Sequence, residues 1–365
     1  MGWSTTSDLE QFAAAAGGYL TSRAAENTLL LSAAQAARQA GAGQPGRAGH
    51  QGAGLLYGWW TPPDGGDPRS AFVDDPAAPL LISGGTPEMA AALAVTLSRL
   101  GRQVCGVDAP TEAADAFGAA WRQRAGTTVR AHRNCRVYRL TAAPPGAQSV
   151  PGTSPRATPP HGMPASWTPP ATPGPAGRAR VATAADRELL AGWLQAAAIE
   201  EAQRLDSPSG LAAGLIGYHG AVFWEIPCKP GLLRDAAHNL AVGHRRDAEV
   251  DYQPVAFAAL TRPVARTIRI SMVYTVPHRR RSGYAGAVTQ AVSRALLWGG
   301  DQNLVPGLLA APSAPGCVRE VVMITDKSRP DRWGVRLGFQ LAGERAVLRF
   351  GPPTGALPRL PRLRR

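Results

Sequence analysis

Hydrophobic residues in the first 141 positions recur alternately with helical and strand-like spacing, which predicts an α/β arrangement. Apolar residues three and four positions apart predict helices over 9–16, 28–38, 89–100 and 111–124. Short apolar runs predict strands over 54–60, 79–82, 103–107 and 137–140. Thr86, Pro87 and Glu88 are typical of a helix start, because they supply a polar residue, an early proline and an acid in the first turn.

The second half of the chain repeats this alternation. Apolar runs predict strands over 178–181, 221–226, 254–260, 268–275, 321–325 and 346–350. Helical spacing predicts helices from about Thr183 to 205, over 288–296 and over 331–337. Within 268–275, Ile268, Ile270, Met272 and Tyr274 alternate with Arg269, Ser271 and Val273, which is the period of a strand. We therefore expect a mixed central sheet that is flanked by helices.

A long break in the pattern runs from about residue 142 to 177. Pro, Gly, Ser and Thr are dense there and charged residues are almost absent. Proline removes backbone donors and the small polar residues bury little surface, so we expect an extended, mobile linker. The linker separates an α/β domain over 1–141 from a second domain over 178–351, and a basic, Pro-rich tail follows over 352–365.

Composition narrows the class of protein. The chain has 365 residues, of which 44% are hydrophobic, 41 are Gly and 33 are Pro. This apolar fraction excludes a wholly disordered chain, and the lack of a Gly-X-Y period excludes collagen. No apolar run reaches the ~18 residues of a membrane span, and residues 1–10 lack the basic and apolar regions of a secretory signal. We therefore expect a cytoplasmic protein with no membrane partner.

The formal net charge of +13 is distributed unevenly along the chain. Residues 1–141 hold 12 Arg and 11 acids, whereas 178–365 hold 26 basic and 15 acidic residues. A basic half can bind nucleic acid, a membrane surface or a polyanionic ligand. Nucleic-acid binding is the less favoured reading, because aromatic residues are not interleaved with the basic ones as single-strand binding requires.

The cysteines and histidines do not indicate a metal. Cys105, Cys135, Cys228 and Cys317 are far apart, no Cys-x-x-Cys pair is present, and the seven His are scattered. We expect reduced thiols and no metal cofactor.

The stretch from Met272 to Ala287, MVYTVPHRRRSGYAGA, has the pattern of a strand, a basic loop and a helix. Unpaired N–H groups at a helix start attract anions, and Gly283 would let a phosphate approach the backbone closely. Arg280 adds charge-assisted donors. The pattern lacks the Gly-Lys-Ser/Thr of a triphosphate loop and the Gly-x-Gly-x-x-Gly of a dinucleotide site. It is consistent with a diphosphate site, although a solvated basic loop would have the same composition.

The order Arg280-x-x-Gly283-x-Ala285 resembles motif A of the GNAT superfamily of N-acetyltransferases. The strands at 254–257 and 268–275 resemble the two that precede this motif. Residues 321–326, and then Arg336-Leu337-Gly338-Phe339, resemble the family's fifth strand and the helix that ends in Leu-Gly-Phe. In the first half, residues 103–107 and the helix after them resemble a degenerate copy of the family's strand–helix unit, without the residues of motif A. An unrelated α/β helper domain is the alternative for that half.

The resemblance implies an acyl-CoA-dependent N-acyltransferase that transfers an acetyl group from acetyl-CoA to a primary amine of unknown identity. It implies small-molecule or peptide amine substrates, and a homodimer is possible. It also implies that the coenzyme contacts a set of residues around motif A: Met272, Val273, Tyr274, Thr275, Arg280, Arg281, Ser282, Gly283, Tyr284, Ala285 and Arg329.

Three departures from the family pattern concern catalysis and cofactor binding. Gly334 stands where the family often has the tyrosine that protonates the departing thiolate, Arg329 replaces an asparagine, and Arg281 and Ser282 replace Gly and Arg. Glu225, Glu320 and Tyr284 are the catalytic candidates, and Asp251 and His278 are further possible bases. The alternative function is a non-catalytic protein that binds coenzyme A or acyl-CoA as a sensor or regulator.

Overall fold

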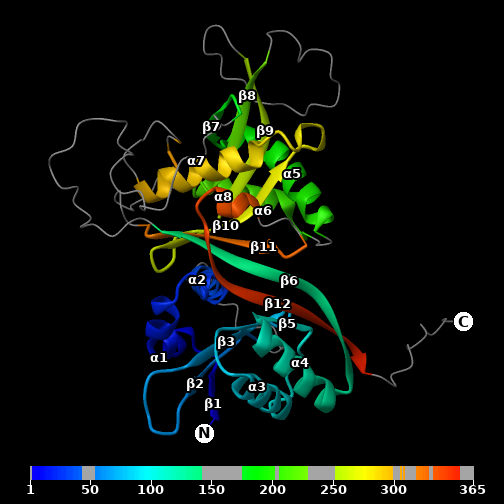
Figure 1. Ribbon diagram of the computed structural model, residues 1–365. Helices are drawn as coiled ribbons and strands as arrows, with labels where there is room; N and C mark the ends of the chain where they lie inside the picture. The colour runs from blue at the N-terminus through cyan, green and yellow to red at the C-terminus, as the bar shows by residue number, and fades with distance from the viewer. Residues whose placement is uncertain are drawn as a thin grey trace, which may run out of the picture. The chain divides into compact units, whose positions relative to one another are not determined.

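The computed structural model describes residues 2–42, 54–141, 175–201, 205–228, 251–298, 305, 307–308, 318–328 and 332–353 (Figure 1). Of the predicted linker only 175–177 are described, and the predicted tail beyond residue 353 lies outside these ranges.

The described elements follow the same order twice along the chain. The first series is β1 (Gly2–Thr6), α1 (Leu9–Ser22), α2 (Thr28–Ala42), β2 (Leu56–Thr61), β3 (Ser70–Asp74), β4 (Leu80–Ile82), α3 (Pro87–Arg99), β5 (Gly106–Pro110), α4 (Thr111–Ala125) and β6 (Thr127–Thr141). The second is β7 (Arg178–Val181), α5 (Arg187–Glu200), α6 (Pro208–Gly217), β8 (Ala221–Cys228), β9 (Asp251–Leu260), β10 (Thr267–Thr275), α7 (Tyr284–Trp298), β11 (Glu320–Asp326), α8 (Arg332–Arg336) and β12 (Gln340–Pro353). The chain therefore contains two structurally repeated halves.

Most elements predicted from the sequence are present, and the misses have local causes. The predicted start of α3 is confirmed, because the Thr86 side chain accepts a hydrogen bond from the N–H of Met89. The predicted helix from Thr183 to 205 is two elements, a 3₁₀ turn at Ala184–Asp186 and then α5. Sequence periodicity missed α6, because its glycines weaken the helical signal. It also missed the short strands β1 and β3.

Two compact units are present, and each takes its last strand from the other half of the chain. Unit 1 comprises 1–137, 325–329 and 341–365, so β12 belongs to it and pairs antiparallel with β5. Unit 2 comprises 138–324 and 330–340, so the end of β6 belongs to it, in the strand order β7-β8-β9-β10-β11-β6. Ala346 and Leu348 pack in the core of unit 1, and Tyr138 and Leu140 pack in the core of unit 2. The halves have exchanged strands.

Unit 1 has helices on both faces of its sheet. α3 and α4 pack together over a core that contains Phe72, Leu93 and Phe117. The other face carries Tyr57, whose ring stacks on Phe12 of α1 at a centroid distance of 5.1 Å. On β12, Phe350 stacks against Phe117 at 6.1 Å. The exchanged strand is thus packed as well as hydrogen-bonded.

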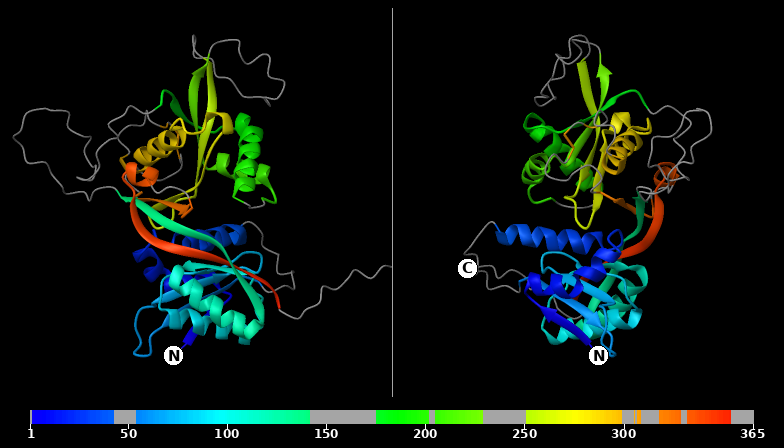
Figure 2. Two further views of the ribbon diagram at one scale, coloured as in Figure 1. Left: turned by 45° about the vertical axis from the view of Figure 1, so that its right-hand side comes forward. Right: turned by 90° about the vertical axis from the view of Figure 1, so that its left-hand side faces the viewer.

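Unit 2 also has two covered faces (Figure 2). On β8 and β9, Val222, Ala256 and Ala258 face the core under α7, while Phe223 and Phe257 alternate with them and face α5 and α6. Phe339, just after α8, packs in the α7 core, so α7 and α8 cover the same face of the sheet. The mixed sheet with flanking helices that the sequence predicted is confirmed.

Strand β10 does not keep one period throughout. Its pairing with β9 shifts between Ile270 and Met272, which marks a bulge at Ser271. Ile268 and Ile270 face α7, whereas Met272 and Tyr274 face α5 and α6. The period of two read from the sequence is therefore interrupted, because the extra residue of a bulge moves every later side chain to the opposite face.

Arg345 fastens the exchanged strand β12 to unit 1. Its side chain is 4% exposed, its Nε donates to Asp108 Oδ1 at 2.8 Å, and its Nη2 donates to the carbonyl oxygens of Asp108 at 2.8 Å and Ile82 at 3.3 Å. These contacts join β12 to both β4 and β5. Removing a guanidinium from such a pair destabilises a protein, because the carboxylate is left without a compensating charge.

We therefore predict that Arg345→Ala lowers the free energy of unfolding by about 3 kcal/mol, because Asp108 and two backbone carbonyls lose their donor. Urea denaturation measures the change. Arg349→Ala is the matched control: it removes an exposed arginine from the same strand and should change stability by less than about 0.5 kcal/mol. Equal effects of the two variants would contradict the prediction.

Candidate functional site

Strands β10 and β11 of unit 2 are paired over only part of their length. Their parallel register runs from Thr267↔Glu320 to Ile270↔Met323 and ends there, although β10 continues to Thr275 and β11 to Asp326. Ser271, the bulge residue that follows the last pair, is exposed in mid-strand. The two strands therefore separate from the bulge onward, and the backbone groups of Met272–Thr275 that do not pair with β9 can bind a ligand.

The loop after β10 ends in two residues of left-handed backbone conformation. A 3₁₀ turn at Pro277–Arg279 leads to Arg280, then Arg281 has φ 65° and Gly283 has φ 85°. The carbonyl of Gly283 accepts from the N–H of Ala287 at 3.0 Å, which fixes the start of α7. Arg281 is strained at such a φ, whereas glycine adopts it readily.

The start of α7 has room for an anion. Among the described residues, a Cβ at Gly283 would meet only Pro175, with its nearest atoms at 3.6 and 3.7 Å, and a Cβ at Gly286 would meet no atom within 4 Å. The first N–H groups of a helix have no acceptor within the helix. Together with the helix dipole they favour a bound phosphate, so the residues present fit the diphosphate of a nucleotide-derived cofactor.

Arg280 is held beside this loop by its own contacts. Its Nε donates to the carbonyl oxygen of Thr275 at 3.0 Å, its Nη2 pairs with Glu200 at the end of α5, and its guanidinium lies 5.5 Å from the ring centroid of Tyr274. The side chain is 40% exposed. In this arrangement Arg280 would share its charge between Glu200 and a bound anion.

The structure brings most of the predicted cofactor residues together. Met272 to Thr275 form the end of β10 that pairs with β9 but lies beyond its pairing with β11. Residues 280–283 form the loop, and Tyr284 and Ala285 begin α7. Tyr274 packs beside Trp193 and Phe257 on the α5 face, where burial raises the pKa of its phenol. Tyr284 packs against the α7 core. Arg329 lies outside the described residues.

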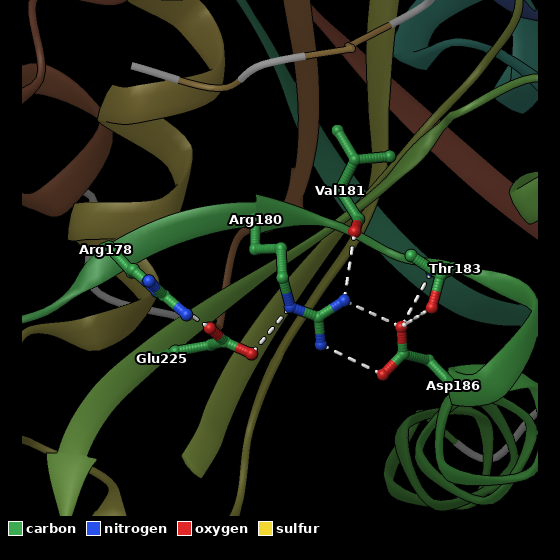
Figure 3. A network of polar contacts seen from close by, with 6 residues as sticks. All are labelled: Arg178, Arg180, Val181, Thr183, Asp186 and Glu225. Carbon is green, nitrogen blue, oxygen red and sulfur yellow. Dashed lines mark hydrogen bonds and ion pairs between the residues drawn. The ribbon is translucent and has the colours of Figure 1, made fainter. Parts of the chain in front are cut away.

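Glu225, a predicted catalytic candidate, belongs to a partly buried network of ion pairs (Figure 3). Its Oε1 accepts from Arg180 Nε at 2.7 Å and its Oε2 from Arg178 Nε at 3.1 Å. Arg180 also binds Asp186 through both Nη atoms, at 2.7 and 2.9 Å. Because both carboxylate oxygens of Glu225 accept from guanidinium groups, the geometry favours a structural role over that of a base.

Asp186 is the second acid of this network. Its Oδ2 accepts from the N–H of Thr183 at 2.7 Å and from the Thr183 hydroxyl at 2.8 Å, which closes the turn before α5. Burial by itself raises the pKa of Asp186, but the bonds from Arg180 and Thr183 outweigh it and lower that pKa below its ordinary value of 3.8. The network therefore ties β7, β8 and α5 together through ionised groups.

The other acid and base candidates are not gathered at the loop. Glu320 is the first residue of β11 and lies opposite Thr267. The loop follows Thr275, eight residues further along β10, which is roughly 26 Å at the usual rise of a strand. Asp251 pairs with Cys228 at the start of β9, and His278 is exposed in the 3₁₀ turn. Of these, only His278 lies on the loop itself.

Gly334 occupies the position where the family resemblance implies a tyrosine. It is a buried residue of α8, and a Cβ there would lie 3.3 Å from Met323 Cε. Met323 belongs to the last residue pair of β10 and β11. A side chain at this position would therefore require the end of the flexible Met323 side chain to shift slightly.

The corresponding loop of unit 1 has its polar groups occupied. Thr86 caps the N–H of Met89, and Pro87 at the first helical position has no N–H. The end of β4 is bonded as well, since the carbonyl of Ile82 accepts from Arg345. Of the two repeats, the second therefore has the loop suited to an anion.

Sequence reasoning missed two features of the site. The bulge at Ser271 has no signal in the amino-acid sequence, because a bulge depends on how the neighbouring strands pair. The Arg180–Glu225–Asp186 network was detectable only in part: Thr183 and Asp186 have the spacing of a capping box, which the structure confirms.

The described residues contain no group of three or more His, Cys, Asp or Glu that could hold a metal ion. Cys105, Cys135 and Cys228 are free thiols, and Cys317 lies outside the described ranges. Among the described helices, none is both long and apolar enough to span a membrane.

Comparison with known proteins identifies the fold. A GCN5-related N-acetyltransferase from Sphaerobacter thermophilus matches with 13% identity and a TM-score of 0.50, over 95% of each chain. A Drosophila protein matches with 13% identity and a TM-score of 0.50, over 96% of this chain and 99% of its own. A tandem GNAT protein from the clavulanic acid biosynthesis pathway matches at a TM-score of 0.35, which is too low to support a conclusion. No family model and no curated protein sequence matches.

The chain has the fold of the GCN5-related N-acetyltransferases, as the sequence motifs predicted. The match spans nearly the whole of both chains, so it includes both repeated halves. At 13% identity it establishes the fold alone.

We predict that Asp186→Asn destabilises the protein at neutral pH, because Arg180 and Thr183 lose a charged acceptor. The pKa of Asp186 is lowered on folding, so its contribution is complete above the ordinary value of 3.8 and is lost as the pH falls through the lower folded value. Urea denaturation of both proteins from pH 7 to pH 3 measures this. The difference between them should shrink below pH ~4; a difference that is constant with pH would contradict the assignment.

Proposed function

We propose that the chain is an N-acyltransferase that uses acetyl-CoA, with the coenzyme bound between β10 and β11 of unit 2 and its diphosphate on the loop 280–285. The observation that carries this proposal is the combination of diverging strands with an open, left-handed loop at Gly283 in front of α7. The fold supports it, because the matching structure from Sphaerobacter thermophilus is described as an N-acetyltransferase.

In this proposal the protein's groups act mainly by binding and polarisation. The N–H groups that begin α7, with Arg280, would hold the diphosphate. Unpaired backbone groups of Met272–Thr275 would hold the pantetheine arm, and an N–H near Val273 or Tyr274 would polarise the thioester carbonyl. When bound, the coenzyme supplies an activated acyl group. Arg281, Ser282, Tyr284 and Arg329 complete the proposed cofactor contacts.

The amine acceptor must lose a proton before it can attack, so the site needs a base or a water chain. Glu320, Tyr284 and Glu225 are the candidates from the sequence. Glu225 is engaged by two arginines and Glu320 lies at the opposite end of β10 from the loop. Tyr284 begins α7 beside the loop, which makes it the nearest of the three to the proposed coenzyme.

The second candidate function is a non-catalytic sensor that binds coenzyme A or acyl-CoA. The buried Gly334 favours it, because no side chain at that position can protonate a departing thiolate. Release of free thiol from acetyl-CoA, followed across a panel of amines, separates the two functions. Amine-dependent release supports the transferase, whereas binding with no release for any amine supports the sensor. We propose a cytoplasmic protein whose partner is a small-molecule or peptide amine, with a homodimer as a further possibility.

We predict that saturating acetyl-CoA raises the melting temperature by several degrees, because a ligand that binds only the folded state stabilises it. Gly283→Asp should abolish this shift by placing a carboxylate beside the diphosphate. Differential scanning fluorimetry and calorimetric titration measure both effects.

Gly126→Asp is the matched control. Gly126 also has a left-handed backbone, at φ 63°, and no atom of the described residues lies within 4 Å of its Cβ position, but it ends α4 in unit 1. It should carry a similar backbone strain and keep acetyl-CoA binding. No shift in the unaltered protein would refute both coenzyme functions, and full binding by Gly283→Asp would refute the placement of the diphosphate.

A further inference from the structure

Arg281 has a backbone conformation that arginine rarely adopts. Its φ is 65°, and the residue before it, Arg280, is extended with φ −67° and ψ 160°. This combination is similar to a type II turn, in which glycine is preferred at the second central position. The Cβ of any other residue lies too close to the following carbonyl oxygen there. The backbone of the loop therefore suits glycine, and Arg281 occupies the position at a steric cost.

The two neighbouring arginines of this loop are used differently. Arg280 donates from Nε to the carbonyl oxygen of Thr275 and pairs through Nη2 with Glu200 of α5. Arg281 is exposed, and within the described part of the chain its side chain has no hydrogen bond or ion pair. Strained residues cluster at ligand sites, where the strain is offset by what the side chain does. What Arg281 adds to the loop is a guanidinium whose charge no described carboxylate shares.

Arg281 also lies close to the place proposed for the diphosphate. It precedes Gly283 by two residues, and two residues of chain span at most about 7 Å. Beside Gly283, the start of α7 has N–H groups that find no acceptor within the helix. A guanidinium near such groups completes a phosphate site, because it adds a full positive charge and a fork of donors that matches phosphate oxygens.

We propose that Arg281 binds a phosphate group of the coenzyme through its guanidinium, and that the loop retains a strained arginine for this contact. The inference rests on the proposed function and identifies the arginine whose charge is not already shared with Glu200. The coenzyme offers two sources of phosphate, its diphosphate and the 3′-phosphate of its ribose, and both suit a guanidinium. Stability and affinity are then opposed at this one residue.

The test separates the side chain of Arg281 from its backbone. Arg281→Ala removes the guanidinium and keeps the left-handed strain, whereas Arg281→Gly removes both. We expect both variants to raise the dissociation constant for acetyl-CoA about tenfold, the lower end for a hydrogen bond to a charged group. Only Arg281→Gly should raise the melting temperature of the protein without ligand, by about one or two degrees.

Calorimetric titration with three ligands locates the phosphate. If Arg281 binds the diphosphate, both variants lose affinity for acetyl-CoA, for its 3′-dephospho form and for adenosine diphosphate. If Arg281 binds the 3′-phosphate, they lose affinity for acetyl-CoA alone, and either result supports the inference. The loss should shrink as the salt concentration rises, because exposed charges are screened. A loss caused by a distorted loop would not depend on salt in this way.

Two variants serve as matched controls. Arg266→Gly removes an arginine of similar backbone conformation, at φ 62° in the turn before β10, and should keep acetyl-CoA binding. Arg279→Ala removes another exposed arginine of the same loop and should raise the dissociation constant by no more than about twofold.

The outcomes distinguish this inference from the proposed function. If the unaltered protein binds acetyl-CoA and Arg281→Ala binds it equally well, the inference is overturned and the proposed function stands. Equal losses in Arg279→Ala and Arg281→Ala would also overturn it, because only the net charge of the loop would then matter. If the unaltered protein binds none of the three ligands, both fail.

Discussion

The short parallel pairing of β10 and β11 is the constraint on which the site of unit 2 depends. Four residue pairs hold the strands together, and a bulge at Ser271 follows the last of them. The bulge reverses the faces of the side chains beyond it, so Met272 and Tyr274 pack under α5 while Val273 and Thr275 face α7. A strand that stayed in register would have its backbone groups bonded to β11. The divergence leaves those groups without partners on β11, at the end of β10 that leads into the loop and the first turn of α7.

Local sequence predicted those parts of the fold that local residues determine. Thr86 and Pro87 fix the start of α3, and the strand, loop and helix around Gly283 could be placed because glycine, arginine and apolar periodicity all lie within sixteen residues. The bulge at Ser271 and the ion pairs of Glu225 could not be predicted in this way, because both depend on neighbouring strands.

Part of the positive charge of the second half is used within the protein. Arg180 binds two carboxylates, Arg178 shares Glu225 with it, and Arg280 pairs with Glu200 beside the loop. The net charge of a segment counts these arginines as available to a partner, whereas the structure shows them engaged. What distinguishes the loop is the arrangement of backbone N–H groups near a glycine. Those groups carry no formal charge and do not enter any charge count.

The exchange of β6 and β12 has a consequence for how the chain can be made. Asp108 and Arg345 are 237 positions apart, so unit 1 cannot complete its sheet until residue 345 has left the ribosome. Until then β5 is an open edge, and open edges invite pairing with other chains. Contacts this distant in sequence also form slowly. The N-terminal half should therefore depend on chaperones during synthesis, and separately produced halves should be soluble only when they are made together.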